Sequence, residues 1–475
     1  MKKGSKVPKN VGRILAGYLA YSLLLGVFSY MIPVHAKKTP DPEQFYGKEV
    51  GPDRALLVEE PKEAFSRRVE LIRSAKNTLD VCCHCAKVGE TTDCFFAEII
   101  KAADRGVQVR VLLDGVVGGL AGPHKDIALA LRSHPNISYG AYNPVNLLKP
   151  WEWNVRFHDK FILADDRMMM LGGRNIGDEY FDPPGYEGAV THDRDVLVLN
   201  TKAGTPESDA SVTAQGKAYM ELLWASGETD RQSPLSGARR EQGIAAQERM
   251  RKLADRWETS YPSYYLPAEA AEEKMVPTRQ ISLLYNPLGN FKKEPALGAA
   301  VAELLKNRES VRIQTPYATA GKETLEALHE IAESAQVDFL TNSVASSPNF
   351  PAFSAYMAKR KAFLETGIRI HEYQSRDSIH GKSCVADGHL SVVGSFNLDD
   401  RSLYIDTESV LVIDSPEFYE QLNGAMEELF AQSALVGPDN EYAPDQPVKP
   451  VEASAGRRGL MKVVSVFSRA FRYLI

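Results

Sequence analysis

The hydrophobic and polar positions of the chain predict the same order of elements twice. In the first half, strands alternate with helices at 78–83, 94–103, 107–113, 124–132 and 137–142. A pair of strands follows, one ending at residue 165 and one at 168–171, and a closing strand lies at 195–199. The second half gives the matching series at 311–315, 321–334, 337–341, 353–366, 368–373, 382–386, 390–393 and 408–413. Period-2 and apolar runs predict the strands, and 3.6-residue spacing predicts the helices. This alternation predicts an α/β fold in which each half is a mixed, mostly parallel sheet flanked by helices.

The segments around these halves divide the chain into six predicted parts. Polar, Pro-containing stretches join two helical segments, near 214–226 and 240–257, between the halves, and a second Pro-rich stretch follows the second half. Such compositions are typical of linkers. The parts are an N-terminal segment (1–38), the first half (60–200), a helical linker (201–280), the second half (281–436), a flexible linker (437–456) and a C-terminal helix (457–475).

The N-terminal segment carries a long uncharged stretch. Residues 14–32 are mostly apolar, with five Lys or Arg before them and two Lys after them. This length predicts a transmembrane helix, and the excess of positive charge before it predicts a cytoplasmic N-terminus. The protein would then cross the cell membrane once, with its body outside the cytoplasm. A cleaved signal peptide ending at Ala36 is the alternative.

Both ends of the chain are basic, whereas its body is acidic. The net charge is −6, but residues 1–13 and 457–475 each carry five Lys or Arg and no acid, which leaves −16 on residues 14–456. The acidic body argues against a nucleic-acid ligand, which needs a basic footprint. Apolar positions in the C-terminal segment recur at helical spacing. They predict a basic amphipathic helix on an anionic membrane surface, or else a helix packed on the body.

The five cysteines are too few for a disulfide framework. Cys82, Cys83 and Cys85 lie in or beside a predicted strand, and Cys94 begins a predicted helix. Structural zinc sites usually have a second ligand pair, which this sequence does not offer, and we expect neither a metal nor another cofactor. We interpret these cysteines as small buried side chains, with a Cys85–Cys94 disulfide as the alternative.

One motif occurs twice. Both copies read H-x-K-x4-D-x6-G-[GS]-x-N, at His158, Lys160, Asp165 and Asn175 and at His380, Lys382, Asp387 and Asn397. A neutral imidazole can attack phosphorus near pH 7, and Lys and Asn can hold phosphate oxygens. Two copies facing each other would supply a nucleophile, a general acid opposite it and donors for the developing charge.

The duplicated motif resembles that of the phospholipase D superfamily, and the runs GGRNIGDEYF (172–181) and GSFNLDDRS (394–402) resemble bacterial cardiolipin synthases. The resemblance implies two similar phospholipase D-like halves with one active site between them. It also implies that His158 forms a phosphohistidine, while His380 protonates the departing alcohol and then activates the incoming one. Gly173 departs from the family's usual Ser, which Ser395 keeps in the second half.

Further residues are expected to complete the site. Asn175, Asn397 and Ser395 are expected to bind the substrate. Each His needs an acceptor for its second ring nitrogen, and we assign this role to Asp195 and Glu408, which open the two closing strands. For Asp195, an ordinary carboxylate at a strand edge is the alternative. Asp165 and Asp387 belong to the catalytic motif, but they end strands and are expected to fix the hairpins and the interface between the halves.

These inferences favour a membrane-bound phosphatidyltransferase that makes cardiolipin from two molecules of phosphatidylglycerol and releases glycerol. A phospholipase D that transfers the phosphatidyl group to water needs the same residues and is the alternative. The acidic body argues against a nuclease of the same superfamily, and intact His and Lys in both copies argue against a catalytically idle scaffold. The expected partners are therefore anionic phospholipids and a membrane.

Overall fold

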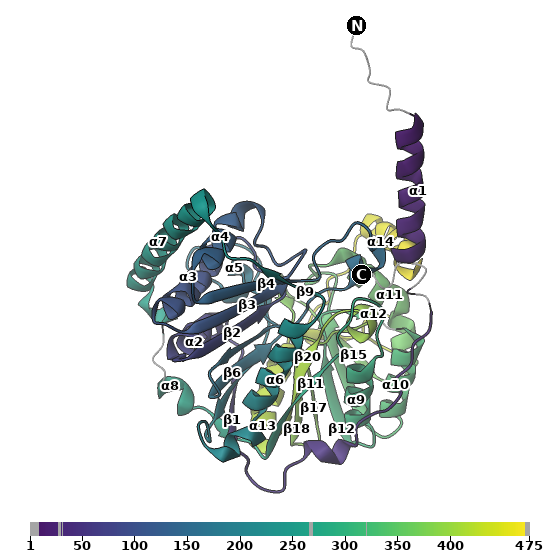
Figure 1. Ribbon diagram of the computed structural model, residues 1–475. Helices are drawn as coiled ribbons and strands as arrows, with labels where there is room; N and C mark the ends of the chain where they lie inside the picture. Colours follow the sequence, from purple (N-terminus) through teal and green to yellow (C-terminus); the bar gives the residue numbers. More distant parts are fainter. Residues whose placement is uncertain (1–8, 27–29, 31, 266–268, 320, 471–475) are drawn as a thin grey trace.

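Two β-sheets, each covered by helices on its outer face, form the body of the protein (Figure 1). The computed structural model describes residues 9–26, 30, 32–265, 269–319 and 321–470. Within these ranges, nine strands form the first sheet, in the order β10 (Val276–Pro277), β1 (Asp53–Val58), β8 (Asp195–Asn200), β6 (Met168–Gly172), β5 (Phe161–Ala164), β2 (Thr78–Cys83), β3 (Gln108–Asp114), β4 (Ile137–Tyr142) and β9 (Thr229–Gln232). Eight described strands form the second, in the order β11 (Gln280–Tyr285), β20 (Ser409–Asp414), β18 (Leu390–Gly394), β17 (Lys382–Ala386), β12 (Ser310–Gln314), β14 (Gln336–Asn342), β15 (Arg369–Tyr373) and β21 (Ser433–Leu435).

Both sheets are mixed, but they are mostly antiparallel, so the expectation of mostly parallel sheets is wrong. Among the strands of these two sheets, only β2–β3–β4 and β12–β14–β15 run parallel. Helices connect the parallel neighbours, as parallel pairing requires. The motif strands form the hairpins β5–β6 and β17–β18, whose short turns make them antiparallel, and the closing strands β8 and β20 continue that pattern.

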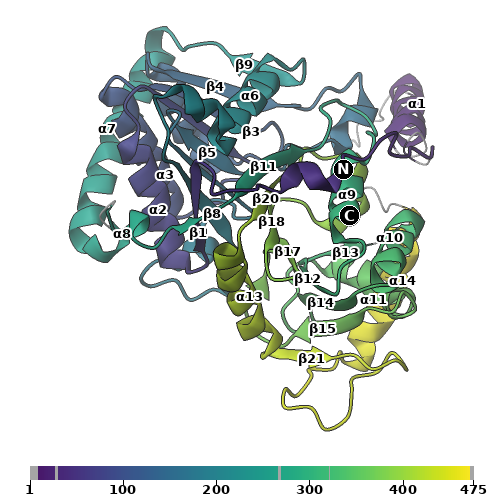
Figure 2. The same ribbon diagram turned by 90° about the horizontal axis from the view of Figure 1, so that it is seen from below.

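Helices complete the layers of the two halves. The helices α2 (Pro61–Ser74), α3 (Glu90–Asp104), α4 (Lys125–Ser133) and α7 (Gly237–Ser260) bury apolar side chains against the first sheet. The helices α9 (Ala296–Leu305), α10 (Lys322–Ala332) and α11 (Phe350–Leu364) do so on the second. A third core joins both sheets with α6 (Val212–Ala225) and α13 (Pro416–Phe430), which lie near the junction of the halves (Figures 1 and 2).

Residues 201–280 are more than the helical linker that the sequence predicted. The helix α7 packs on α3 and α4, and β9 extends the first sheet beside β4. Apolar residues such as Ala246, Met250 and Trp257 place one face of α7 in the first core. Much of this segment therefore belongs to the first half.

The expected transmembrane helix is not supported. The helix α1 spans Lys9–Gly26, and its uncharged part is residues 14–26, shorter than the roughly 20 apolar residues that usually cross a bilayer. Within the described part of the chain, no helix is both long enough and apolar enough for a membrane span. Residues 27–29 and 31 of the predicted stretch lie outside the described residues.

The C-terminal helix α14 (Ala455–Ala470) lies against α11. Met461 is buried in the core of the second half, whereas Leu460 and Val463 are exposed. The expected helix is present, and one side of it packs on the body. Residues 471–475 of the predicted helix lie outside the described residues.

The cysteines are buried, as the sequence predicted, except for the half-buried Cys85. Cys82 and Cys83 lie on β2, and Cys94 lies on α3. Cys85 and Cys94 are free thiols, so the alternative disulfide is not formed.

Candidate active site

Two short parallel pairings join the halves, and each runs beside a motif His. Phe157 pairs with Thr407, and β16 (Ser378–Ile379) pairs with β7 (Thr191–His192). His158 and Glu408 directly follow the two residues of the first pairing. His380 and Asp193 directly follow the two strands of the second. The halves therefore exchange acceptors, so that the carboxylate for each imidazole comes from the other half.

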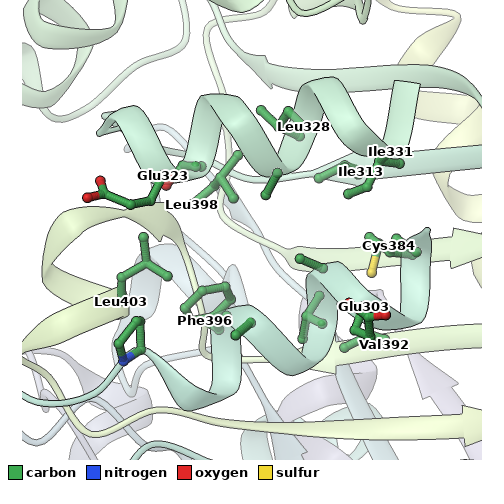
Figure 3. Close-up of a pocket in the computed structure, with 18 of the residues that line it drawn as sticks. Glu303, Ile313, Glu323, Leu328, Ile331, Cys384, Val392, Phe396, Leu398 and Leu403 are labelled. Atoms are coloured by element: carbon green, nitrogen blue, oxygen red, sulfur yellow. The ribbon is translucent and has the colours of Figure 1, made fainter. Parts of the chain in front are cut away.

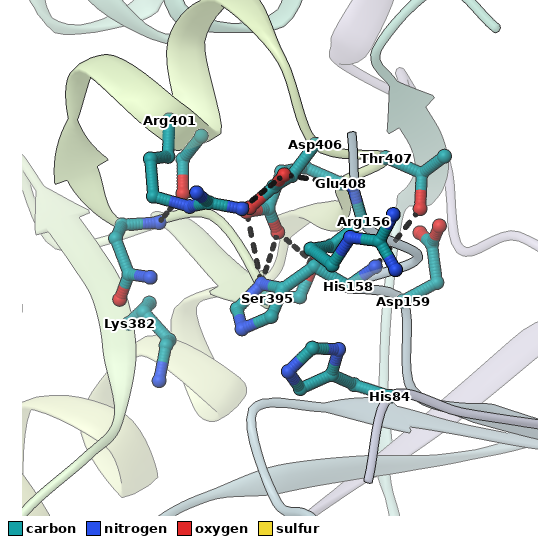
Figure 4. A network of polar contacts seen from close by, with 12 residues as sticks. His84, Arg156, His158, Asp159, Lys382, Ser395, Arg401, Asp406, Thr407 and Glu408 are labelled. Atoms are coloured by element: carbon teal, nitrogen blue, oxygen red, sulfur yellow. Dashed lines mark hydrogen bonds and ion pairs between the residues drawn. The ribbon is translucent and has the colours of Figure 1, made fainter. Parts of the chain in front are cut away.

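Glu408 holds His158. The Nδ1 of His158 lies 2.9 and 3.0 Å from the two carboxylate oxygens of Glu408. The hydroxyl of Ser402 donates to the same carboxylate over 2.6 Å, and that of Ser395 also donates to it. The backbone N–H of His158 donates to Thr407 Oγ1 over 3.0 Å. This network fixes the ring and leaves Nε2 as the nitrogen available for attack (Figure 4).

Asp193 and Lys382 hold His380. The Nδ1 of His380 lies 2.5 Å from Asp193 Oδ2, and Lys382 Nζ lies 2.8 and 3.1 Å from the two ring nitrogens. The rings of Tyr180 and Tyr317 stand edge-on to the imidazole, with centroid distances of 5.7 and 6.0 Å. Tyr180 comes from the first half and Tyr317 from the second, so aromatic rings of both halves pack against this imidazole.

Asp195 does not contact either imidazole, and the assignment of Asp195 as an acceptor is wrong. Its carboxylate instead pairs with Arg68 at 2.8 Å and with Arg174 at 2.9 Å, fully buried. The register explains the difference, because Gly172 pairs with Asp195 where Gly394 pairs with Val410. The residue equivalent to Glu408 is therefore Asp193, which precedes Asp195 by two residues, or about 6.6 Å along an extended strand.

Gly173, the departure from the repeated motif, has a steric reason. A Cβ at this position would lie 2.4 Å from Asp193 Oδ1. In the second half, Glu408 has a longer side chain, and Ser395 donates to it. The shorter aspartate approaches the backbone at Gly173, so the glycine leaves room for the acceptor of His380. Ser395 donates to Glu408, the acceptor of His158, so its contact in the structure differs from the substrate contact that the sequence predicted.

Asp165 and Asp387 lie at the other ends of the motif strands, away from the two His, so a catalytic role for them is wrong. Asp165 accepts backbone N–H groups of residues 76, 77 and 78 over 2.8–2.9 Å, and Asp387 accepts those of residues 309 and 310 over 3.1 Å. Both adopt a positive φ, 53° and 50°. They anchor each hairpin to the strand beside it, but within one half rather than between the halves.

The motif Lys and Asn side chains are buried near the imidazoles. Lys160 Nζ donates to the carbonyl oxygen of His158 over 2.5 Å, and Lys382 Nζ donates to that of His380. The side-chain oxygens of Asn175 and Asn397 have no hydrogen-bond partner within the described structure. Buried polar atoms without partners are costly, so these amides are suited to a polar ligand.

His84 is part of the site, although the sequence singled out only the cysteines around it. Its ring centroid lies 4.8 Å from that of His158, and the two rings meet edge to face (Figure 4). Nδ1 of His84 lies 2.6 Å from the carbonyl oxygen of Phe157. His84 therefore supports both the ring and the backbone of the first motif.

Burial sets the charge of the two imidazoles. Burial and the neighbouring Lys160 hold the pKa of His158 well below its usual range, and burial with Lys382 lowers the pKa of His380 to about 4. Both rings are thus neutral near pH 7. Burial also raises the pKa of Glu408 well above its usual range, whereas His380 and Lys382 outweigh burial at Asp193 and lower its pKa. The surroundings of the two acceptors therefore shift their pKa values in opposite directions.

The described residues contain no group of three or more His, Cys, Asp or Glu side chains arranged to hold a metal ion. The site itself contains imidazoles, ammonium groups and amides. These supply nucleophile, acid and anion-binding donors in one buried place.

A model of the family "Cardiolipin synthase, PLD-like domain" matches residues 69–200 and 301–430, more than half of the chain. The chain belongs to the phospholipase D-like family. The two matched segments coincide with the two halves of the fold, one motif in each. This phospholipase D-like protein is therefore an enzyme that transfers groups at phosphodiester bonds.

Similar proteins agree with this assignment. Cardiolipin synthase C of Escherichia coli is 27% identical over 432 residues, which cover 79% of this chain and 84% of that protein. An uncharacterized protein of Helicobacter pylori is 28% identical over 428 residues, which cover 80% of each chain. The solved structure of phosphatidylserine synthase from Haemophilus influenzae aligns with a TM-score of 0.63 at 15% identity, over 94% of this chain and 98% of that one, and so shares the fold.

Proposed function

We propose that this enzyme is a phosphatidyltransferase that makes cardiolipin from two molecules of phosphatidylglycerol. His158 Nε2 attacks the phosphatidyl phosphorus, the bond to glycerol breaks, and His380 gives the departing glycerol its proton. His380 then takes the proton of the hydroxyl group of a second phosphatidylglycerol, whose oxygen attacks the phosphohistidine. Cardiolipin forms, and His158 is released unchanged.

The observation that carries this proposal is the crosswise pair of imidazoles, each oriented by a carboxylate of the other half. In-line displacement needs one group that attacks phosphorus and another that protonates the leaving oxygen on the opposite side. The similarity to cardiolipin synthase C over four fifths of the chain supports the choice of phosphatidylglycerol.

The unequal acceptors support His158 as the nucleophile. A neutral imidazole is needed for attack, and the buried Glu408 carboxyl has a raised pKa, which favours a neutral partner. A general acid must carry a proton when the leaving group departs. The ionised Asp193 favours a charged His380 once the negative phosphate is bound.

We also propose that the enzyme docks on the membrane through an exposed apolar surface, formed by the side chains of α1 and of the loop 145–148. Leu15 and Leu19 of α1 are exposed, and so are Leu147 and Leu148, at 64% and 79%. Tyr18 and Tyr21 donate from α1 to the carbonyl oxygens of Leu147 and Leu148 over 2.8 and 2.9 Å, which holds the two parts together. Apolar side chains exposed in this way mark contact sites for membranes or proteins.

The loop 145–148 leads from β4 to the first motif, so docking there would bring the active site near the lipid. Replacing Leu148 by Glu should weaken sedimentation with vesicles of phosphatidylglycerol and phosphatidylcholine at least fivefold. Ile244→Glu, at an exposed position on α7, is the matched control and should bind as the original protein does. Equal binding by all three proteins would contradict the docking surface.

The proposed reaction is tested with purified enzyme and phosphatidylglycerol in mixed micelles, with the lipid products identified by mass. We expect cardiolipin and free glycerol, and we expect neither from His158→Ala or His380→Ala, provided that both variants melt at the original temperature. Phosphatidic acid as the main product would establish the hydrolase instead. In His380→Ala, a phosphatidyl adduct on the peptide that contains His158 would support the assigned nucleophile.

A further inference from the structure

An apolar cavity of about 290 Å³ lies in the second half and meets the hydrogen-bond network of His380 at Lys382. It lies between α9 and α10, above the outer face of the second sheet (Figure 3). Ile313 of β12, Cys384 of β17 and Val392 of β18 line its floor, and Phe396 and Leu403 line one end. Residues 34–36 and Thr39 of the N-terminal segment contribute to its wall.

One end of this cavity belongs to the active site. Lys382, whose Nζ contacts the ring of His380, is one of its lining residues, and so is Ser383. The register of β17 with β18 pairs Cys384 with Val392 and Lys382 with Gly394, two residues before Phe396. Lys382 therefore lies at the Phe396 end of the cavity, and Cys384 lies further along it.

The floor of the cavity beyond Lys382 is apolar. Ile313 pairs with Cys384, and Cys384 pairs with Val392, so these three side chains form one apolar surface on the face of the sheet that carries the cavity. Ile331 and Leu328 of α10 add aliphatic lining, and Glu303 and Lys306 also line the cavity. Lys306, directly after α9, pairs with Glu330 of α10 at 2.8 Å, which ties the two helices together.

We propose that this cavity binds one acyl chain of the phospholipid whose phosphate is held by the two His. The inference rests on the proposed function and adds to it a site for the tail. A glycerophospholipid has a polar ester region next to its phosphate and an apolar chain beyond it, the same order as the lining from Lys382 to Ile331. Cavities lined by apolar side chains stay dry and take apolar ligands.

The size of the cavity is suited to a chain. An engineered cavity of about 150 Å³ in another protein binds benzene, so twice that volume holds on the order of a dozen carbon atoms. Lys382 at one end of the cavity places the phosphate end of the lipid there, with the chain beyond it.

Two alanines allow the cavity to be filled without disturbing the motifs. Ala302 of α9 and Ala327 of α10 line it, both are half-buried, and both lie inside helices. Ala302→Leu and Ala327→Leu should lower kcat/KM for dioleoyl phosphatidylglycerol at least tenfold and leave that for dihexanoyl phosphatidylglycerol within twofold. Ala358→Leu, at an exposed position inside α11, is the matched control and should leave both within twofold. Unchanged kcat/KM for the long-chain lipid in both variants would overturn the proposal.

A second measurement keeps the cavity testable apart from turnover. Phosphatidylglycerol with a diazirine near the end of one acyl chain should, on irradiation with the original protein, label residues 296–305 or 322–332. Excess dioleoyl phosphatidylglycerol should compete, and Ala327→Leu should lose the label. Labelling confined to other segments would overturn the proposal. The labelling also tests the cavity if a variant loses kcat/KM equally for both lipids. An enzyme that turns over neither lipid would defeat the proposed function, while the labelling would still test the cavity.

Discussion

The carboxylate of Glu408 lies 2.9 Å from Nδ1 of His158, a residue 250 positions earlier in the chain. The same relationship joins Asp193 to His380 across 187 positions. In both cases, the acceptor and the imidazole come from different halves. The packing of the halves is therefore a condition for each imidazole to be oriented, and the two motif copies depend on each other.

The two neighbouring aspartates of the first half should behave differently when replaced by Asn. Asp193→Asn removes the charge that orients His380 and should lower kcat by roughly 10²–10⁴-fold. Asp195→Asn weakens the buried pairs with Arg68 and Arg174 and should lower the free energy of unfolding by about 3–5 kcal/mol. Steady-state kinetics and denaturant unfolding of both variants separate these effects. A catalytic defect in Asp195→Asn without a loss of stability would contradict the assignment.

Gly173 and Ser395 occupy equivalent positions but should tolerate alanine unequally. In Gly173→Ala the new Cβ would meet Asp193 Oδ1 at 2.4 Å, so the carboxylate must move away from His380. We expect kcat to fall at least tenfold more in Gly173→Ala than in Ser395→Ala, which removes the hydroxyl that donates to Glu408 and accepts from the backbone N–H of Ser409. Rates per folded molecule, with circular dichroism as the check of folding, test this order, and the reverse order would refute the steric explanation.

The pH dependence of kcat/KM should report the free enzyme's Lys382. Burial lowers the pKa of this ammonium group to about 7, so it is protonated below pH 7 and loses its charge above it. We expect kcat/KM to decrease about tenfold per pH unit above pH 7, whereas kcat should hold to higher pH because the bound phosphate raises the pKa of Lys382. The residual activity of Lys382→Gln should lack this decrease. A flat kcat/KM up to pH 9 in the original enzyme would show that the charge is not needed.

Asp165 and Asp387 should affect stability rather than catalysis. Alanine at either position loses the hydrogen bonds to two or three backbone N–H groups and must adopt a positive φ. We expect Asp165→Ala to lower the free energy of unfolding by about 3 kcal/mol, with kcat/KM per folded molecule unchanged. Asp165→Asn is the matched control, because Asn tolerates this backbone conformation and should lose less. A lower kcat at an unchanged melting temperature would instead indicate contact with the substrate.

Local patterns predicted most of the elements that carry the site. The strands at 78–83, 137–142 and 382–386 were predicted with their observed bounds, because alternation and apolar runs depend only on neighbouring residues. The predominance of parallel strands was predicted wrongly, since periodicity is the same in parallel and antiparallel sheets. The strands β1 and β11, which pair with the closing strands, were missed because no repeat or motif marks them.

The acceptors show where sequence reasoning reached its limit. Glu408 was found because it stands directly before a closing strand, and Asp195 was chosen by the same rule. Aligning the two closing strands by their apolar residues, with Val196 opposite Leu411, would have pointed to Asp193. That Glu408 serves the His of the other half depends on how the halves pack, which no local pattern contains. His84 was missed because the cysteine-rich run around it was interpreted as small buried side chains.

The exchange of acceptors has a consequence for the protein during its synthesis on the ribosome. A ribosome that has released residues up to about 300 has already exposed the first motif, yet His158 still lacks the carboxylate that orients it, since Glu408 has not been translated. A nascent first half therefore carries His158 without the carboxylate that orients it. The orientation of this imidazole can be completed only when nearly the whole polypeptide has been made.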